Sequence, residues 1–167
     1  MPDGRAPETG TLYDRDFYAW TQDQAARLRA LDGDARLDAA HLAEEIADLG
    51  KSDKRALESH LTAALKHLRK AAAARSDDPV PHWMGEIRTQ LRHARKILEQ
   101  SPSLKTKTDL AALWDEALQE ANADLRDFGD PQLPAGLACP FDLDSLLDAR
   151  FDPWDGRTHV RRAAGGA

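Results

Sequence analysis

Residues 38–75 carry an apolar pattern with helical spacing that lasts far longer than one ordinary helix requires. Such spacing is typical of an amphipathic helix that packs one side against a core. Gly50 lies inside the pattern, but a glycine within a helix costs only about 1 kcal/mol. We therefore favour one continuous or mildly kinked helix with Asp38 as its N-cap. In the alternative, Gly50 ends a first helix and Ser52 caps a second. The positions of the apolar face are 42, 46, 49, 53, 57, 61, 64 or 65, and 68.

Shorter amphipathic segments surround the long one, and turn-forming residues separate them. Asp32-Gly33-Asp34 precedes it, and the proline-containing stretch 76–81 follows it. Serine, aspartate and glycine stand where helix caps belong. The expected helices are residues 14–31 with Asp14 as N-cap, residues 82–100, residues 103–128 with Ser103 as N-cap and Gly129 after the end, and a short helix at residues 142–148.

The composition agrees with this helical pattern. Two valines are present among 167 residues, so strand-forming side chains are scarce, whereas 41% hydrophobic residues suffice for a core. We predict an all-α fold, an antiparallel bundle of about four main helices with a C-terminal arm and a short helix. Residues 1–11 are expected to be a flexible lead-in, residues 12–153 a single helical-bundle domain, and residues 154–167 a disordered tail.

Charge and cysteine content exclude several classes of protein. The net charge of −6 disfavours nucleic-acid and anionic-membrane binding, because both require basic surfaces. Cys139 is the single cysteine, so an intrachain disulfide is impossible. No segment approaches the roughly 20 apolar residues of a membrane span, and the N-terminus shows no apolar signal segment. We therefore expect a cytoplasmic protein that binds neither nucleic acid nor membrane.

Four side chains of the long segment form the candidate polar site: Glu45, His41, His60 and His67. Glu45 and His41 are four residues apart, which suits an ion pair or two metal ligands. The group is either a carboxylate–histidine metal site in a bundle or a set of residues that form hydrogen bonds along the helix seam. We favour the second interpretation, because Glu45 and His67 would lie roughly 33 Å apart on a straight helix. A break at Gly50 or a dimer would reopen the first.

Cys139 and the tryptophans also allow two interpretations each. Cys139 is either a reactive thiol or a buried structural cysteine, and we favour the latter. Trp20, Trp83 and Trp114 fall on apolar faces and are expected to anchor the core. Together with Tyr13 and Tyr18, Trp20 could instead line a small-molecule groove, although no ligand is specified.

An ordered series of short motifs resembles the bacterial family called domain of unknown function 29. The resemblance spans about residues 12–153. It implies an all-α domain and a bacterial source and it implies no activity, and the cofactor is left unknown. The chain departs from the family pattern after His67, where Arg69 and Ala71 interrupt a Leu-Leu-Lys-Trp type of ending. The motifs are Leu12-Tyr13-Asp14-x-Asp16-Phe17-Tyr18-x-Trp20, Leu42-Ala43-Glu44-Glu45-Ile46…Leu49-Gly50, His67-Leu68-x-Lys70, Trp83…Ile87, Ser101-Pro102-Ser103-Leu104 and Cys139-Pro140-Phe141…Leu146-Leu147.

Two hypotheses of function follow. The first is a non-enzymatic helical interaction domain that self-associates as a homodimer, since the sequence has long Ala/Leu seams and no known catalytic motif. The alternative is a metal-binding helical bundle, hydrolase-like, that uses Glu45 with His41 or His60.

Overall fold

The long amphipathic segment forms one continuous helix, α3 (Ala39–Ala73, 35 residues). The computed structural model describes residues 10–31 and 37–165, and Gly50 lies within the helix rather than in a turn. The Asp38 carboxylate accepts a hydrogen bond from the backbone N–H of His41, as expected of the N-cap. The predicted continuous helix is confirmed, and at about 1.5 Å per residue it is about 50 Å long.

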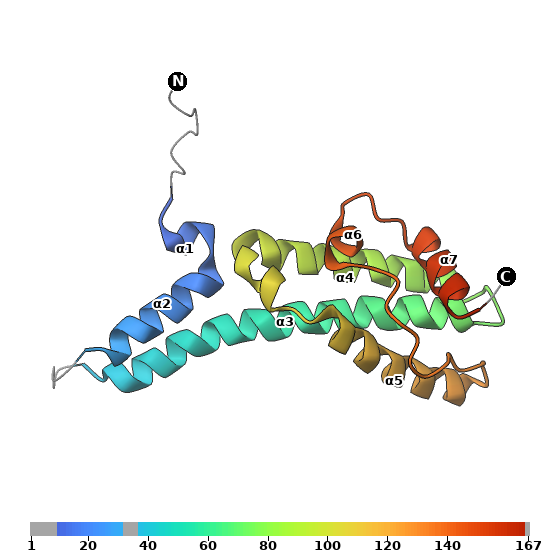
Figure 1. Cartoon of the computed structure of the whole chain (residues 1–167), viewed down its shortest axis with the longest axis horizontal. Helices are drawn as coiled ribbons and strands as arrows, with labels where there is room; N and C mark the ends of the chain where they lie inside the picture. The colour runs from blue at the N-terminus through green and yellow to red at the C-terminus, as the bar shows by residue number, and fades with distance from the viewer. Residues whose placement is uncertain (1–9, 32–36, 166–167) are drawn as a thin grey trace, which may run out of the picture.

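The other long helices pack against α3, and the described residues contain no strand. Figure 1 shows α2 beside the N-terminal half of α3, and α4, α5 and α7 beside its C-terminal half. The predicted all-α bundle of about four main helices is confirmed. The remaining helices are α1 (Leu12–Arg15), α2 (Phe17–Arg29), α4 (Val80–Gln100), the 3₁₀ helix η1 (Pro102–Lys107), α5 (Leu110–Phe128), α6 (Leu143–Leu147) and α7 (Pro153–Ala163).

The main core surrounds the C-terminal half of α3, and we call this part of the molecule the body. Large apolar side chains from α3, α4 and α5 are buried there, including the expected anchors Trp83 and Trp114. Burial of each large aliphatic side chain stabilises the fold by about 1.5–3 kcal/mol. The fully buried large residues of this core include Leu57, Leu61, Leu65, Leu68, Ile87, Leu91 and Trp114.

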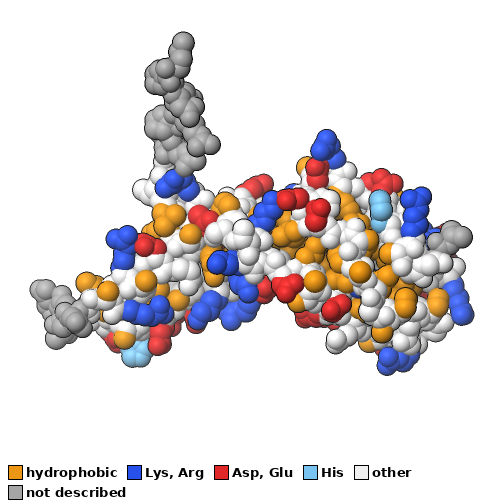
Figure 2. All heavy atoms as spheres, in the orientation of Figure 1, with side chains coloured by type: hydrophobic (Ala, Val, Ile, Leu, Met, Phe, Trp, Pro, Cys, Tyr) orange, Lys and Arg blue, Asp and Glu red, His pale blue; other side chains and the backbone are white. Residues whose placement is uncertain are grey.

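The beginning of α3 is covered differently, and among the described residues its main neighbour is α2. We call α2 together with residues 38–50 the N-terminal hairpin, which Figure 2 shows as a narrow projection from the body. Its contact uses small residues: Ala43, Ala47 and Gly50 are the buried residues of this stretch. A Cβ atom on Gly50 would overlap the hydroxyl of Thr21 in α2. Gly50 is therefore explained by the close approach of two backbones, and it is not a helix break.

The beginning of the hairpin differs from the prediction. A separate turn, α1, ends at Arg15, and Asp16 rather than Asp14 is the N-cap of α2, accepting from the backbone N–H of Ala19 at 2.9 Å. Asp16 also accepts from the backbone N–H and the hydroxyl of Ser103, at 2.8 and 3.0 Å. This long-range use of its carboxylate fixes the helix start at Asp16, and local sequence could not reveal it.

The prediction that Ser103 caps the helix ending at Phe128 is also wrong. Pro102 opens a 3₁₀ helix, and α5 begins only after Asp109, whose carboxylate accepts from the backbone N–H of Ala112. Ser103 is instead engaged by Asp16 across 87 residues of sequence. The end of the helix is as predicted, because Gly129 adopts the left-handed conformation with φ of 74°.

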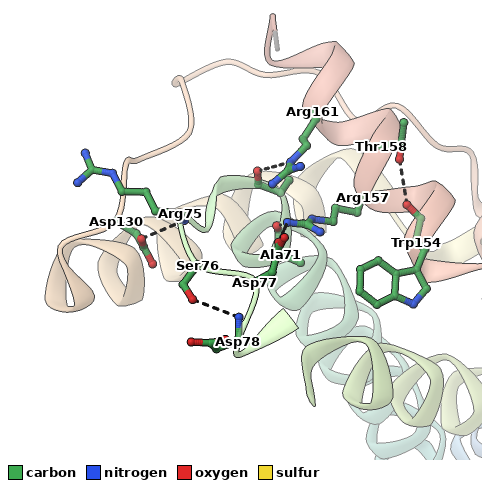
Figure 3. A network of polar contacts seen from close by, with 11 residues as sticks. Ala71, Arg75, Ser76, Asp77, Asp78, Asp130, Trp154, Arg157, Thr158 and Arg161 are labelled. Carbon is green, nitrogen blue, oxygen red and sulfur yellow. Dashed lines mark hydrogen bonds and ion pairs between the residues drawn. The ribbon is translucent and has the colours of Figure 1, made fainter. Parts of the chain in front are cut away.

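The C-terminal segment expected to be a disordered tail forms helix α7. A Cβ on Gly156 would lie 2.8 Å from the Phe151 ring, so α7 packs closely on the body. Arg157 Nε donates to the Ala71 carbonyl at 2.8 Å, and Arg161 Nε donates to that of Ala72 at 3.0 Å (Figure 3). The last carbonyls of a helix have no partner within the helix, so these two arginines satisfy the end of α3. The polar, Ala- and Gly-rich composition of residues 154–167 did not reveal that this segment is ordered.

Some expectations fall outside the described part of the chain. Residues 1–9 of the expected lead-in and the expected break at Asp32-Gly33-Asp34 are among them. The predicted short helix at residues 142–148 is confirmed as α6. None of the described helices combines the length and apolarity needed to cross a membrane.

Candidate functional site

The structure does not bring the four predicted polar candidates together. His41 is exposed, and its Nδ1 lies 2.6 Å from Asp38 rather than beside Glu45. Glu45 is exposed to solvent too. Since α3 is continuous, Glu45 and His67 are separated by roughly 33 Å of helix. Within the described residues, no group of three or more His, Cys, Asp or Glu side chains could hold a metal ion.

His60 and His67 lie in the body, in different surroundings. His60 Nδ1 is 2.7 Å from Oε1 of Gln90, and its ring centroid is 5.0 Å from that of His93. His67 Nδ1 is buried and has no hydrogen-bond partner among the described residues. Burial, followed by the nearby charge of Lys70, lowers the pKa of His67, so its imidazole is neutral at pH 7. The two histidines therefore act at the seam between helices as separate groups.

A polar groove of about 470 Å³ separates α3 from α5. Lys70 Nζ lies 2.8 Å from Asp124, and Lys66 Nζ lies 3.3 Å from both Glu120 and Asp124. The pKa of Asp124 is lowered mainly because its carboxylate accepts a hydrogen bond from Lys70. Although burial alone would lower the pKa of Lys66, its two acidic partners raise it. Lys66 and Lys70 both have carboxylate partners on α5, so these ion pairs across the groove hold α5 on α3.

Arg69 is the least satisfied polar side chain of the body. It is 0% exposed, its Cζ lies 3.4 Å from the Trp114 ring centroid, and its three guanidinium nitrogens have no hydrogen-bond partner among the described residues. Burial lowers the pKa of Arg69 to about 10. Burial also raises the pKa of the Cys139 thiol, which packs half-buried against the same core. A neutral thiol in this setting agrees with the preferred structural interpretation of Cys139.

The hairpin exposes large apolar side chains that the body does not cover. Leu42 is 40% exposed and Leu49 is 54% exposed, and Ile46 between them is half-buried. These three residues, which we call the leucine stripe, share one side of α3 at 100° per residue. Leu31 and Leu37, at the end of the hairpin, are also exposed, by 54% and 42%. Figure 2 shows apolar side chains at the surface of the projecting hairpin, among charged ones.

A second hollow lies where the start of the hairpin meets the end of α4. It measures about 410 Å³, and its lining includes Tyr13 and Phe17 of the first sequence motif. Ser101 belongs to another motif and fixes this corner, because its hydroxyl oxygen accepts from the backbone N–H of Tyr18 and its O–H donates to Asp53 at 3.4 Å. Sequence reasoning had singled out the aromatic cluster near Trp20, but not the contribution of Asp53. The helical pattern places Asp53 on the face of α3 towards α4. Its neighbours Ser101 and Glu99 come from a distant part of the sequence and are brought to it only by the fold.

Comparisons with known proteins support the fold and name a family. The model of the family described as domain of unknown function DUF29 matches residues 12–152. A crystal structure of an alpha-helical protein of unknown function from Rhodospirillum rubrum is similar, with a TM-score of 0.77 and 29% sequence identity. The match covers 89% of this chain and 97% of that one. No curated protein matches the sequence significantly.

Proposed function

We propose that this chain, which belongs to the DUF29 family, is a non-enzymatic helical interaction domain that self-associates through its N-terminal hairpin. The observation that carries the proposal is the exposed leucine stripe on α3. Large apolar side chains that recur on one helix face and remain exposed mark an interaction surface more often than a solvated one.

The stripe continues a face that is buried further along the same helix. At 100° per residue, His60 projects to the same side of α3 as Leu42 and Leu49, and His60 contacts Gln90 of α4. Helix α4 ends near Asp53, as the hydrogen bond between Ser101 and Asp53 indicates. Beyond that point no described helix covers this face. A helix from another molecule would extend the packing that α4 begins.

The charges of the hairpin favour a second copy as the occupant. Residues 38–50 contain four acidic residues and neither lysine nor arginine, whereas α2 contains two arginines and one aspartate. A two-fold arrangement in which α2 of one copy packs against α3 of the other would pair opposite charges. The overall charge of −6 also supports a protein partner over a nucleic acid. A cytoplasmic location remains our expectation.

Sedimentation equilibrium of the full chain tests the proposal. We expect the unaltered protein to form dimers, and the double variant Leu42→Gln, Leu49→Gln to dissociate at least about tenfold more readily. Glutamine preserves helix propensity and removes apolar surface. Phe128→Gln serves as the matched control, because Phe128 is 74% exposed on α5 and lies outside the hairpin. A strictly monomeric parent protein, or equal weakening by the control, would contradict the proposal.

A further inference from the structure

The hollow between the start of the hairpin and the end of α4 has a composition that self-association does not require. Its walls come from α1, α2, α3 and α4, so residues far apart in sequence meet there. It encloses about 410 Å³, which is enough for a small organic group. We call it the corner pocket. The described residues that line it are Tyr13, Asp14, Phe17, Asp53, Glu99 and Gln100.

Aromatic rings form one wall of the corner pocket. The Tyr13 ring centroid lies 5.7 Å from that of Phe17 and 4.8 Å from that of Trp20, and both pairs are edge-to-face. These contacts hold Tyr13 in place although the residue is 52% exposed to solvent. The faces of aromatic rings carry partial negative charge and attract cations.

Three carboxylates and the neutral amide of Gln100 form the rest of the lining, and none of the described lining residues is basic. Asp14 uses one oxygen, Oδ2, for the backbone N–H and the hydroxyl of Thr11, and these hydrogen bonds lower the pKa of Asp14. Asp53 accepts one long hydrogen bond from Ser101 through Oδ2. Among the described residues, Oδ1 of each of these two carboxylates accepts no hydrogen bond. Glu99 is exposed at the rim.

We propose that the corner pocket binds an organic cation, an alkylammonium or guanidinium group. Carboxylates and aromatic faces both favour positive charge, and a concave site with one sign of charge concentrates ligands of the opposite sign. The three carboxylates surround the cavity and do not converge, since the described residues contain no group of three acidic or histidine side chains able to share a metal ion. The aromatic wall suits an ammonium or guanidinium carried on carbon better than a hydrated metal ion.

NMR titration of the full chain tests this inference. Tetramethylammonium chloride represents a free small cation, and the amides of N-acetyl-lysine and N-acetyl-arginine represent side chains of a protein partner. Neopentyl alcohol, a neutral compound of similar shape, and sodium chloride at equal ionic strength are the controls. We expect saturable shifts at Tyr13 and Phe17 with at least one cation, with Kd in the roughly millimolar range. The cation with the lowest Kd identifies the source of the ligand.

Two variants locate the binding. Tyr13→Leu keeps an apolar side chain and Glu99→Gln keeps its shape, and each should weaken binding about two- to fivefold. Glu44→Gln and Phe128→Leu remove the same chemical groups outside the pocket and should leave Kd unchanged. Saturation by no cation, equal shifts with neopentyl alcohol, or an unchanged Kd in both pocket variants would overturn the inference. The double variant Leu42→Gln, Leu49→Gln leaves the corner pocket intact. The outcome of the sedimentation test of self-association is therefore independent of the outcome of the cation titration.

Discussion

The two halves of α3 belong to one helix, yet they are stabilised in different ways. In the body, large side chains interdigitate with three other helices, and Leu61, Leu65 and Leu68 are fully buried. In the hairpin, one helix approaches through Ala43, Ala47 and Gly50, which bury little apolar area. Since stabilisation scales with buried apolar area, most of the free energy of folding comes from the body and little of it comes from the hairpin contact. The larger side chains Leu42 and Leu49 of the hairpin are exposed, where a partner can reach them.

The largest test of this contrast is a pair of leucine truncations. Leu65→Ala removes a fully buried side chain from the body and should lower the free energy of unfolding by about 2–5 kcal/mol. Leu49→Ala removes a 54% exposed side chain from the hairpin and should change the unfolding of the monomer by less than about 0.5 kcal/mol. Urea denaturation at low protein concentration measures both. Equal losses would mean that the hairpin is packed as tightly as the body.

The next contrast compares two arginines. Arg157 is 8% exposed, donates to the Ala71 carbonyl, and pairs with Asp77 at 2.5 Å (Figure 3). Arg157→Met leaves that buried carbonyl without a partner and should lower the free energy of unfolding by about 1–3 kcal/mol. Arg27→Met in the hairpin breaks an exposed pair with Asp23 and should change it by roughly 0.3–0.5 kcal/mol. Thermal unfolding followed by circular dichroism separates the two, and a harmless Arg157→Met would show that α7 does not stabilise the end of α3.

A pair of glycines sharpens the contrast at the helix contact. Gly50→Ala places a Cβ against the buried Thr21 hydroxyl, which already donates to the Tyr18 carbonyl at 2.7 Å. Overpacking of about 1–3 kcal/mol should exceed the gain of about 1 kcal/mol in helix propensity, giving a net loss. Gly85→Ala in α4 meets nothing within 4 Å and should gain up to about 1 kcal/mol. Chemical denaturation measures the sign of each change, and a stabilising Gly50→Ala would refute the close contact.

Local patterns predicted the elements of both regions, but not what joins them. The continuity of α3 followed from spacing, because a glycine costs little in a helix, and Asp38 was recognisable as a cap. Asp16 was missed as the helix start because its second partner, Ser103, lies 87 residues away. Helix α7 was missed because its order depends on arginines that bind the end of another helix. The candidate site failed for the same reason: spacing placed four polar residues on one helix, whereas packing decides which residues meet.

The smallest effect distinguishes the two regions by the sign of their pH dependence. Burial lowers the pKa of His67 in the body below its ordinary value of 6.5. At pH values between the folded-state pKa and 6.5, the unfolded chain therefore binds more protons than the folded chain. The contribution of His67 to stability is therefore present above pH 6.5 and is lost as the pH falls through the folded-state pKa. The hydrogen bond to Asp38 raises the pKa of His41 in the hairpin, so its contribution is present below 6.5 and is lost as the pH rises through the folded-state pKa.

Removing each histidine should consequently bend the stability curve in opposite directions. Between about pH 7.5 and about pH 5, His67→Gln should reduce the loss of stability on acidification, whereas His41→Gln should increase it slightly, because the exposed pair is screened by solvent. Urea unfolding at a series of pH values and constant ionic strength measures both slopes. Equal slopes in the two variants would remove the electrostatic part of the contrast, while opposite slopes would show that one helix holds a desolvated histidine in the body and a solvated, paired one in the hairpin.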